Sequence, residues 1–411
     1  MYICRMKINQ QTIDFVQEHR NDDVRALALK AHHNDVNLSW ALDQIQGWQT
    51  ARRKLPSWST VDGIIYPPHL SMEQCSSEAT ARYKCGIVEC LPLSQLKTLI
   101  DLTGGFGVDF AFMAQAFERA IYVERQEHLC ETAKHNFGLL ELTHAQVIHD
   151  EAANVLKRLE GKGIDASSTL LYLDPARRND NASRTYAIED CTPNVLELMP
   201  QLLKAAHRVL LKLSPMLDWH KAINDLGCQV KEVHIVGTAG ECKELLVLLE
   251  KWHEGEPAVH CVNDQEMIVF KPSEETTPAP ISPDASTAQF LYEPNASVMK
   301  AGCFGVIAQR YGICAIAADS HLFVGDMMIA DFPGRAFSIT AVSTMNKKEL
   351  RRALAGLGKA NVAVRNFPLT AQQLRRRLKL GDGGDCYIFG TTTDRAEHLL
   401  FICQRIAKHT T

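Results

Sequence analysis

Asp101-Leu-Thr-Gly-Gly-Phe-Gly-Val-Asp109 follows a short apolar run and opens an amphipathic stretch, which is the pattern of a strand, a glycine-rich turn and a helix. Gly105 and Gly107 allow the backbone to turn tightly and to approach a ligand at the helix N-terminus. Free N–H groups and the helix dipole favour a polar or anionic group there. We therefore expect a ligand at this turn, although a tight connection between strand and helix would by itself also explain the glycines.

The turn does not fit the fingerprint of a dinucleotide-binding site. That motif needs a small residue at its third glycine position, and counting from Gly105 this position falls on the bulky Phe110. Nicotinamide cofactors are therefore disfavoured. Asp101, the acid that ends the first strand, would not bind a pyrophosphate, because both groups are anionic. It suits a cationic or hydroxyl-bearing ligand. This points to S-adenosylmethionine.

Acidic residues also end the next predicted strands. Glu124 ends AIYVE, 23 residues after Asp101, and its carboxylate suits both ribose hydroxyls. Asp150 ends AQVIHD and is a candidate acceptor for the adenine amino group, while Asp174 ends TLLYLD, near the expected place of the reactive methyl group. For Glu124 or Asp150 alone, a solvated strand-end acid or a helix N-cap is the better explanation. Because open α/β sheets bind ligands at the carboxyl ends of their strands, the four together predict one cofactor site.

The wider chain predicts several domains. Short apolar runs alternate with amphipathic stretches over residues 97–271, which predicts a doubly wound parallel α/β sheet, with a candidate antiparallel edge strand within 244–261. The expected domains are a helical element at 1–62, the sheet domain at 63–272, a proline-rich linker at 273–288, a segment at 289–334 with one helix over 295–311, and a basic α+β domain at 335–411.

Composition excludes several classes of protein. The 411 residues have the apolar and charged content of a folded protein of two or three domains. The 13 cysteines include no CxxC pair, so neither a disulfide framework nor a zinc motif is indicated. No apolar stretch approaches the length of a membrane span, and we expect a cytoplasmic protein without a membrane partner.

On these residues the chain resembles the class I S-adenosylmethionine-dependent methyltransferases over roughly Pro67 to Lys271. The resemblance implies a Rossmann-like methyltransferase sheet and, without any metal, a methyl transfer driven by positioning. It assigns cofactor contacts to Asp101, Gly105, Gly107, Glu124 and Asp150, which match the family pattern, and to Thr103. Thr103 stands where many members have a glycine.

A stretch before the first strand, Met72 to Lys84, is similar to the element that closes over the methionine end of the cofactor in this family. The resemblance makes Gln74 and Ser77 candidate contacts. An ordinary helix with Ser76 or Ser77 as its N-cap explains the same residues equally well.

The loop Asp174-Pro175-Ala176-Arg177-Arg178 lies where this family places its target base. Related amino-group methyltransferases have Asn/Asp-Pro-Pro-aromatic there, so the resemblance gives Asp174 and Pro175 a catalytic place. Arg177 replaces the aromatic residue, and an arginine plane can stack on a base or clamp a phosphate, as can Arg178. Surface ion pairing is the alternative for both arginines. Methylation at carbon-5 of a pyrimidine would instead need a thiol nucleophile, and Cys191 is the nearby candidate. The alternative for Cys191 is a packing role.

The C-terminal part of the chain is basic. From Arg335 onward there are 14 Lys and Arg against 5 Asp and Glu, whereas the rest of the chain is acidic overall. Such a patch favours a polyanion partner, although a solvated helix face is the ordinary explanation. The candidate RNA-binding residues on the predicted helices and strand are Arg351, Arg352, Lys359, Arg365, Arg375, Arg376, Arg377 and Lys379.

The region from Tyr292 to Asp385 is similar to the ferredoxin-like and THUMP-like C-terminal region of a bacterial family of inferred RNA methyltransferases. This resemblance implies a structured RNA substrate, either tRNA or rRNA. Two other readings stay open: a methyltransferase acting on a small molecule or a protein, and an RNA-binding scaffold without catalysis.

Overall fold

The computed structural model describes residues 8–30, 35–92, 96–159, 165–177 and 187–407. The chain divides into two compact units. Unit 1 comprises residues 1–230 and 247–254, and unit 2 comprises residues 231–246 and 255–411. No helix within the described ranges is long and apolar enough to cross a lipid bilayer.

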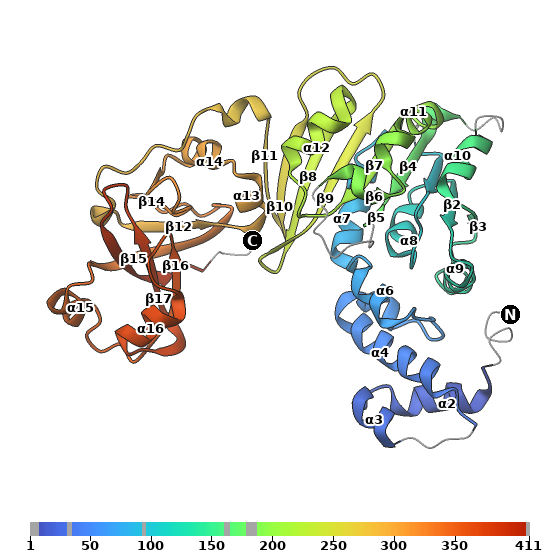
Figure 1. The fold of residues 1–411 in the computed structure, drawn as a ribbon, viewed down its shortest axis with the longest axis horizontal. Coiled ribbons are helices and arrows are strands. Elements are labelled where there is room, and N and C mark those ends of the chain that lie inside the picture. Colours follow the sequence, from blue (N-terminus) through green and yellow to red (C-terminus); the bar gives the residue numbers. More distant parts are fainter. Residues whose placement is uncertain (1–7, 31–34, 93–95, 160–164, 178–186, 408–411) are drawn as a thin grey trace. The chain divides into compact units, whose positions relative to one another are not determined.

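Unit 1 begins with the predicted small helices (Figure 1). They are α2 (Gln10–His19), α3 (Val24–Lys30), α4 (Leu38–Lys54) and α5 (Pro56–Ser59). Asn9 and Asn37 cap α2 and α4 by accepting hydrogen bonds from the N–H groups of Thr12 and Trp40. Two helices, α6 (His69–Gln74) and α7 (Glu78–Glu89), follow before the first strand.

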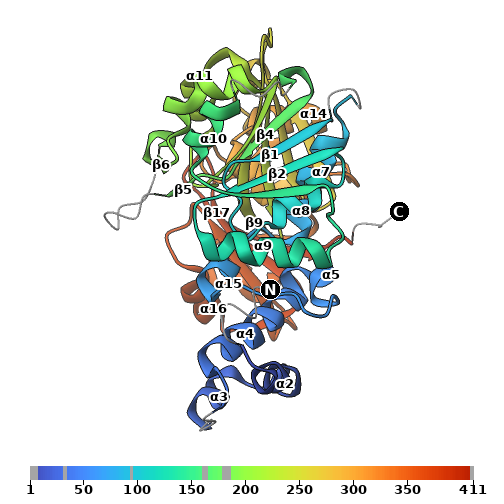
Figure 2. The same cartoon turned by 90° about the vertical axis from the view of Figure 1, so that its right-hand side faces the viewer.

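A nine-stranded sheet has the order β11-β10-β8-β9-β7-β4-β1-β2-β3. In unit 1 the strands of this sheet and the helices that follow them are β1 (Thr98–Asp101), α8 (Val108–Ala114), β2 (Arg119–Glu124), α9 (Glu127–Leu139), β3 (Ala145–His149), α10 (Ala152–Leu159), β4 (Thr169–Leu173), α11 (Val195–Ala205), β7 (Arg208–Leu213) and α12 (Trp219–Leu226). The strands β1, β2, β3, β4 and β7 pair in parallel, and Figure 2 shows β4, β1 and β2 side by side. The predicted parallel, doubly wound arrangement is confirmed.

The prediction of an edge strand within 244–261 is wrong. The four strands that follow α12 are β8 (Val230–Thr238), β9 (Glu241–Glu250), β10 (Ala258–Asn263) and β11 (Glu266–Phe270). In the strand order β9 lies between β8 and β7, and β11 is the edge, antiparallel to β10. The run Leu245–Leu249 is buried at every position, which is typical of a strand that is covered on both faces.

The C-terminal part of unit 2 contains a mixed seven-stranded sheet with the order β13-β14-β12-β15-β18-β17-β16. Its elements are β12 (Phe290–Pro294), α13 (Ala296–Ala301), α14 (Phe304–Tyr311), β13 (Cys314–Ala315), β14 (Phe323–Gly325), β15 (Gly334–Ser343), α15 (Lys347–Ala353), β16 (Lys359–Arg365), α16 (Ala371–Leu378), β17 (Gly381–Thr392) and β18 (His398–Arg405). From β15 onward strands and helices are mixed, as expected for the predicted α+β arrangement. Leu374, Ile388 and Leu400 are fully buried where α16 packs on the sheet.

One local prediction in unit 2 needs correction. The single helix expected over 295–311 is two helices, because Gly302 adopts a left-handed conformation (φ +75°) that ends α13. The linker at 273–288 stays a prediction, and the stretch after Lys271 begins with the 3-10 helix Pro272–Thr276. It also lies against α14, where a β-carbon on Gly305 would fall 1.8 Å from the carbonyl oxygen of Thr277.

Candidate functional site

The glycine-rich turn joins β1 to α8 in the tight conformation that its sequence predicts. Gly105 and Gly107 have positive φ angles of +55° and +84°, and Gly107 is the left-handed N-cap of α8. A β-carbon on Gly107 would lie 2.8 Å from the ring of Phe137. At Gly105 a β-carbon would meet, among the described residues, only the Thr103 carbonyl oxygen, at 3.8 Å, so these residues leave space beside the glycine.

Asp101 ends β1 and is only 1% exposed. Its Oδ1 accepts a hydrogen bond of 2.9 Å from the N–H of Thr103. The Thr103 hydroxyl accepts a bond of 2.6 Å from the N–H of Asp174, which ties the end of β1 to the end of β4. Burial raises the pKa of Asp101 well above its ordinary value, Thr103 opposes this, and the negative charges of Asp109, Asp174 and Glu124 raise it further.

Glu124 ends β2 and points back at the turn. Its two carboxylate oxygens accept hydrogen bonds from the N–H groups of Gly105, at 2.9 Å, and Gln126, at 2.8 Å. It is 7% exposed. These two bonds fix the carboxylate beside the glycines, and each oxygen keeps a lone pair for a further donor.

Asp150 differs from the other strand-end acids. Its Oδ1 accepts hydrogen bonds from the N–H of Glu151 and from Asn154, and its other oxygen pairs with Arg158. Asn154, the Glu151 N–H and Arg158 lower its pKa to about 2. The carboxylate thus binds groups of α10 and of the residue before it. Its expected contact with adenine stays a prediction.

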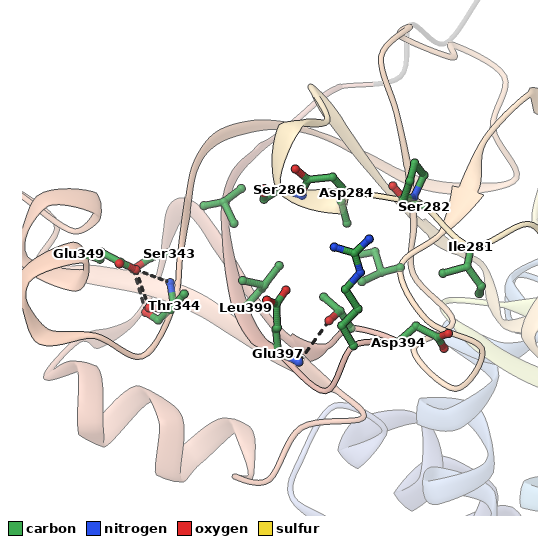
Figure 3. A pocket seen from close by; sticks show the side chains of 16 residues that line it. Ile281, Ser282, Asp284, Ser286, Ser343, Thr344, Glu349, Asp394, Glu397 and Leu399 are labelled. Atoms are coloured by element: carbon green, nitrogen blue, oxygen red, sulfur yellow. Dashed lines mark hydrogen bonds between the residues drawn. The ribbon is translucent and has the colours of Figure 1, made fainter.

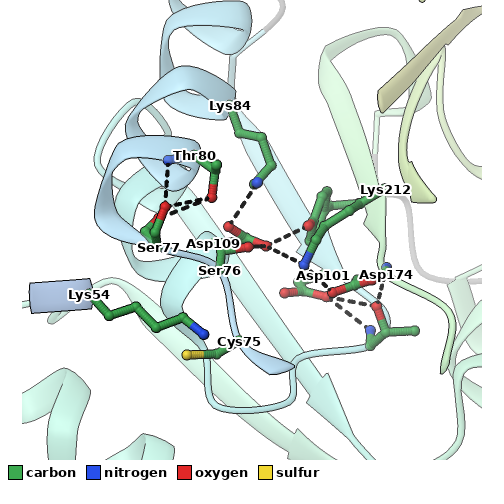
Figure 4. A network of polar contacts seen from close by, with 12 residues as sticks. Lys54, Cys75, Ser76, Ser77, Thr80, Lys84, Asp101, Asp109, Asp174 and Lys212 are labelled. Atoms are coloured by element: carbon green, nitrogen blue, oxygen red, sulfur yellow. Dashed lines mark hydrogen bonds and ion pairs between the residues drawn. The ribbon is translucent and has the colours of Figure 1, made fainter. Parts of the chain in front are cut away.

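A charged network adjoins the strand ends. Its central group is Asp109 on α8, which was not predicted as a site residue. Asp109 accepts hydrogen bonds from Tyr172, at 2.7 Å, and Ser76, at 2.8 Å. Lys84 Nζ lies 3.2 Å and Lys212 Nζ 3.6 Å from its two oxygens. Figure 4 shows Asp109 between the two lysines.

The lysines balance this buried acid. Burial alone would raise the pKa of Asp109, but Lys84 and Lys212, with the hydroxyls of Tyr172 and Ser76, outweigh it and hold the pKa at about 2. Lys84 is fully buried and Lys212 is 12% exposed. Lys212 also lies 2.6 Å from Oδ2 of Asp174, whose side chain is 39% exposed. The network therefore connects the buried interior to Asp174, which is more exposed than Pro175.

The loop after Asp174 is described in part. Pro175 is buried, and Ala176–Arg177 form the short strand β5, which pairs with β6 (Cys191–Thr192). The side chain of Arg177 and the whole of Arg178 lie outside the described part. Cys191 is 4% exposed, which suits a packing role better than a nucleophile.

The stretch before β1 is a capped helix. Ser77 is the N-cap of α7 and accepts a hydrogen bond of 3.2 Å from Thr80 N–H, while Gln74 is exposed at the end of α6. Their contacts with a cofactor stay predictions. It is Ser76 that reaches the charged network, through Asp109.

The predicted RNA-binding residues fall into two groups. Arg365 pairs with the buried Glu293 at 2.8 Å, and Arg375 pairs with Asp382. The others are exposed on α15, β16 and α16: Arg351, Arg352, Lys359, Arg376, Arg377 and Lys379. The second group is the better placed to meet phosphates.

Unit 2 also holds an open cavity of about 650 Å³, drawn in Figure 3. Four acids and one arginine line it: Asp284, Glu349, Asp394, Glu397 and Arg395. Its excess of negative charge does not suit a phosphate.

Comparisons with known proteins agree with this architecture. Residues 290–333 match the model of a ferredoxin-like domain, and residues 334–405 match the model of a THUMP domain-like family. No curated protein matches the chain. A candidate methyltransferase from Porphyromonas gingivalis W83, of known structure, is 28% identical, with 97% of this chain and 99% of that chain covered and a TM-score of 0.83.

Two further solved structures align over part of the chain, below the level that shows a common fold. A candidate class I S-adenosylmethionine-dependent methyltransferase from Listeria monocytogenes is 8% identical, with 62% of this chain and 94% of that chain covered and a TM-score of 0.39. An rRNA methylase from Streptococcus thermophilus is 14% identical, with 42% and 93% covered and a TM-score of 0.30.

The match over the whole length confirms the expected likeness to a methyltransferase at the level of the fold. The chain has the fold of the Porphyromonas gingivalis protein, and within it a ferredoxin-like domain is followed by a THUMP-like domain.

Proposed function

We propose that this protein is an S-adenosylmethionine-dependent methyltransferase that modifies a base in structured RNA. The observation that carries the proposal is the convergence of three acids from three parallel strands, Asp101, Glu124 and Asp174, beside a left-handed glycine turn. Burial, and after it the negative charges of Asp109, Asp174 and Glu124, raise the pKa of Asp101. A sulfonium nucleoside is cationic and bears hydroxyl groups, so its chemistry complements this set of acceptors.

In this proposal each acid has a separate task. Glu124, fixed by two backbone N–H groups, accepts from the ribose hydroxyls, and Asp101 faces the cationic end of the cofactor. The cofactor supplies an activated methyl group when it is bound, so no further activation of that group is needed. Asp174 accepts a hydrogen bond from the methyl-accepting nitrogen and orients its lone pair.

Lys212 is a positioning residue in the same scheme. Its ammonium group binds Oδ2 of Asp174 and leaves Oδ1 for the substrate. The ion pair with Asp109 restrains the position of the ammonium group further. Because the Asp174 carboxylate is then held in one orientation, less conformational freedom is lost when the substrate binds.

The RNA part of the proposal rests on charge and on the THUMP-like domain. The exposed basic residues of α15, β16 and α16 provide affinity without sequence information, as phosphate contacts do. A target base within a duplex would have to be flipped out to reach the loop beside Asp174.

The test is methyl transfer to RNA. The protein is incubated with cofactor carrying a radiolabelled methyl group and with total RNA from cells that lack the protein. The RNA is then digested to nucleosides. We expect label in one modified nucleoside, a strong loss in Asp174→Ala and no loss in the control Asp165→Asn, which changes an exposed acid. Label in small molecules or protein, with none in RNA, would contradict the proposed substrate.

A further inference from the structure

Three side chains able to bind a metal ion lie together in unit 2. Strands β8 and β10 are parallel, with His234 directly beside His260 and Glu232 beside Ala258. Alternate residues of a strand share a face, so Glu232 and His234 point to the same side of the sheet. His260 joins them from the neighbouring strand.

The contacts bring one ligand atom from each of the three residues to within 4.8 Å of the others. His234 Nε2 lies 3.1 Å from Oε2 of Glu232, and the rings of His234 and His260 are stacked with centroids 4.4 Å apart. His234 is 3% exposed. The cluster is therefore held by the sheet rather than by flexible loops.

One atom of the cluster lacks a partner. His260 Nε2 is buried and makes no hydrogen bond among the described residues. A buried ring nitrogen without a partner is costly, and such a group calls for an explanation. A ligand that accepts its lone pair would provide one.

The protonation states agree with this geometry. Burial, and then the neighbouring His234, lower the pKa of His260 to about 4, so its ring is neutral near pH 7. The hydrogen bond from His234 lowers the pKa of Glu232. Neutral imidazole and ionised carboxylate are the forms that bind metal ions.

We propose that Glu232, His234 and His260 bind one first-row transition-metal ion of the Zn²⁺ class. Two imidazoles and a carboxylate are ligands that Zn²⁺ accepts, and a fourth position is left for water. The ion would join two strand segments separated by more than 20 residues and stabilise unit 2. The site is independent of the proposed methyl transfer, which needs no metal.

The first experiment measures Zn²⁺ binding by competition with a chromogenic chelator, using the metal-free full chain. Wild type should bind one more tight equivalent than His260→Gln or Glu232→Gln. The affinity of that equivalent should fall by more than about 100-fold, since even loss of an outer partner of a ligand costs roughly 10–100-fold. His398→Gln, which changes an exposed histidine of the same unit, should behave like wild type. Equal stoichiometry and affinity in all four proteins would overturn the proposal.

Two further readouts separate this site from adventitious binding, which the 13 cysteines make necessary. Zn²⁺ should raise the unfolding temperature of wild type and His398→Gln but not of His260→Gln. Substituted Co²⁺ should give only the weak visible bands of nitrogen and oxygen ligands. Intense thiolate charge-transfer absorption that persists in His260→Gln would place the ion on cysteines and overturn the proposal. Circular dichroism without metal verifies that the variants are folded.

Discussion

Asp101 is a carboxyl group almost entirely removed from water and surrounded by other acids. Burial and the charges of Asp109, Asp174 and Glu124 all disfavour its ionised form, and the hydrogen bond from Thr103 N–H opposes them. A bound cation would reverse this balance, because it stabilises the carboxylate. Cofactor binding and ionisation of Asp101 should therefore be coupled.

This coupling predicts a pH dependence. The affinity for S-adenosylmethionine should increase as pH rises through the raised pKa of Asp101 and level off above it, because binding to the protonated form must release a proton. Calorimetry in buffers of different ionisation enthalpy measures that proton. The dependence should be lost in Asp101→Asn, and its persistence there would show that another group is responsible.

A second prediction concerns Lys84, which is buried against Asp109. Lys84→Met should lower the free energy of unfolding by about 3 kcal/mol at pH 7, since it removes one partner of a buried charge. Because the pKa of Asp109 is held at about 2, below the value of 3.8 for a free carboxyl, its ion pairs add stability above about pH 4. That contribution disappears as pH falls towards 2.

Urea unfolding at a series of pH values measures this effect. The difference between wild type and Lys84→Met should shrink as pH falls from about 4 to 2. Lys221→Met, which breaks an exposed pair with Asp225, provides the control and should cost less at every pH. A constant difference across the range would show that Lys84 stabilises the protein through packing and not through its charge.

At the scale of elements, the turn before α8 depends on glycine. Gly107→Ala would place a β-carbon 2.8 Å from Phe137 on a residue with φ +84°, and we expect a loss of roughly 1–3 kcal/mol of stability. Gly138→Ala, near the end of α9, is the matched control, because no atom of the described residues lies within 4 Å of the added carbon, and it should be neutral or stabilising. Thermal unfolding compares the two. Equal effects would mean that the turn tolerates other conformations.

The elements that carry the site could be predicted from the sequence. The runs ending in Asp101, Glu124 and Asp174 are short, apolar and separated by helices, so their strand ends meet at one edge of a parallel sheet. Local sequence could not predict the end of α13, because a glycine such as Gly302 occurs both within helices and at their ends.

The buried lysines could not be predicted either. Lys84 on α7 and Lys212 on β7 look like ordinary surface residues in the sequence, and only tertiary packing brings them to Asp109. Asp109 itself stands in the motif that decides the fold. Because Asp109 is not at a strand end, the sequence did not indicate that it takes part in the network. Similarly, Arg365 and Arg375 read as free basic residues until their acidic partners are seen.

At the scale of the whole molecule, the exposed basic residues should govern RNA binding. Arg376→Gln combined with Arg377→Gln should weaken binding to different RNAs by similar factors and reduce the salt slope by about 1 for each phosphate that the double variant no longer binds. Filter binding across salt concentrations measures both. Arg119→Gln, an exposed change in unit 1, is the control. An unchanged slope in the double variant would move the RNA-binding surface elsewhere.

The central claim is that acids from neighbouring strand ends bind one cationic cofactor, and calorimetric titration with S-adenosylmethionine tests it most directly. Wild type and the control Asp165→Asn should bind one equivalent with the same affinity. Asp101→Asn and Glu124→Gln should each bind about 10- to 150-fold more weakly, which corresponds to the roughly 1.5–3 kcal/mol of a hydrogen bond to a charged group. Equal affinity in all four proteins, or no binding by wild type, would contradict the claim.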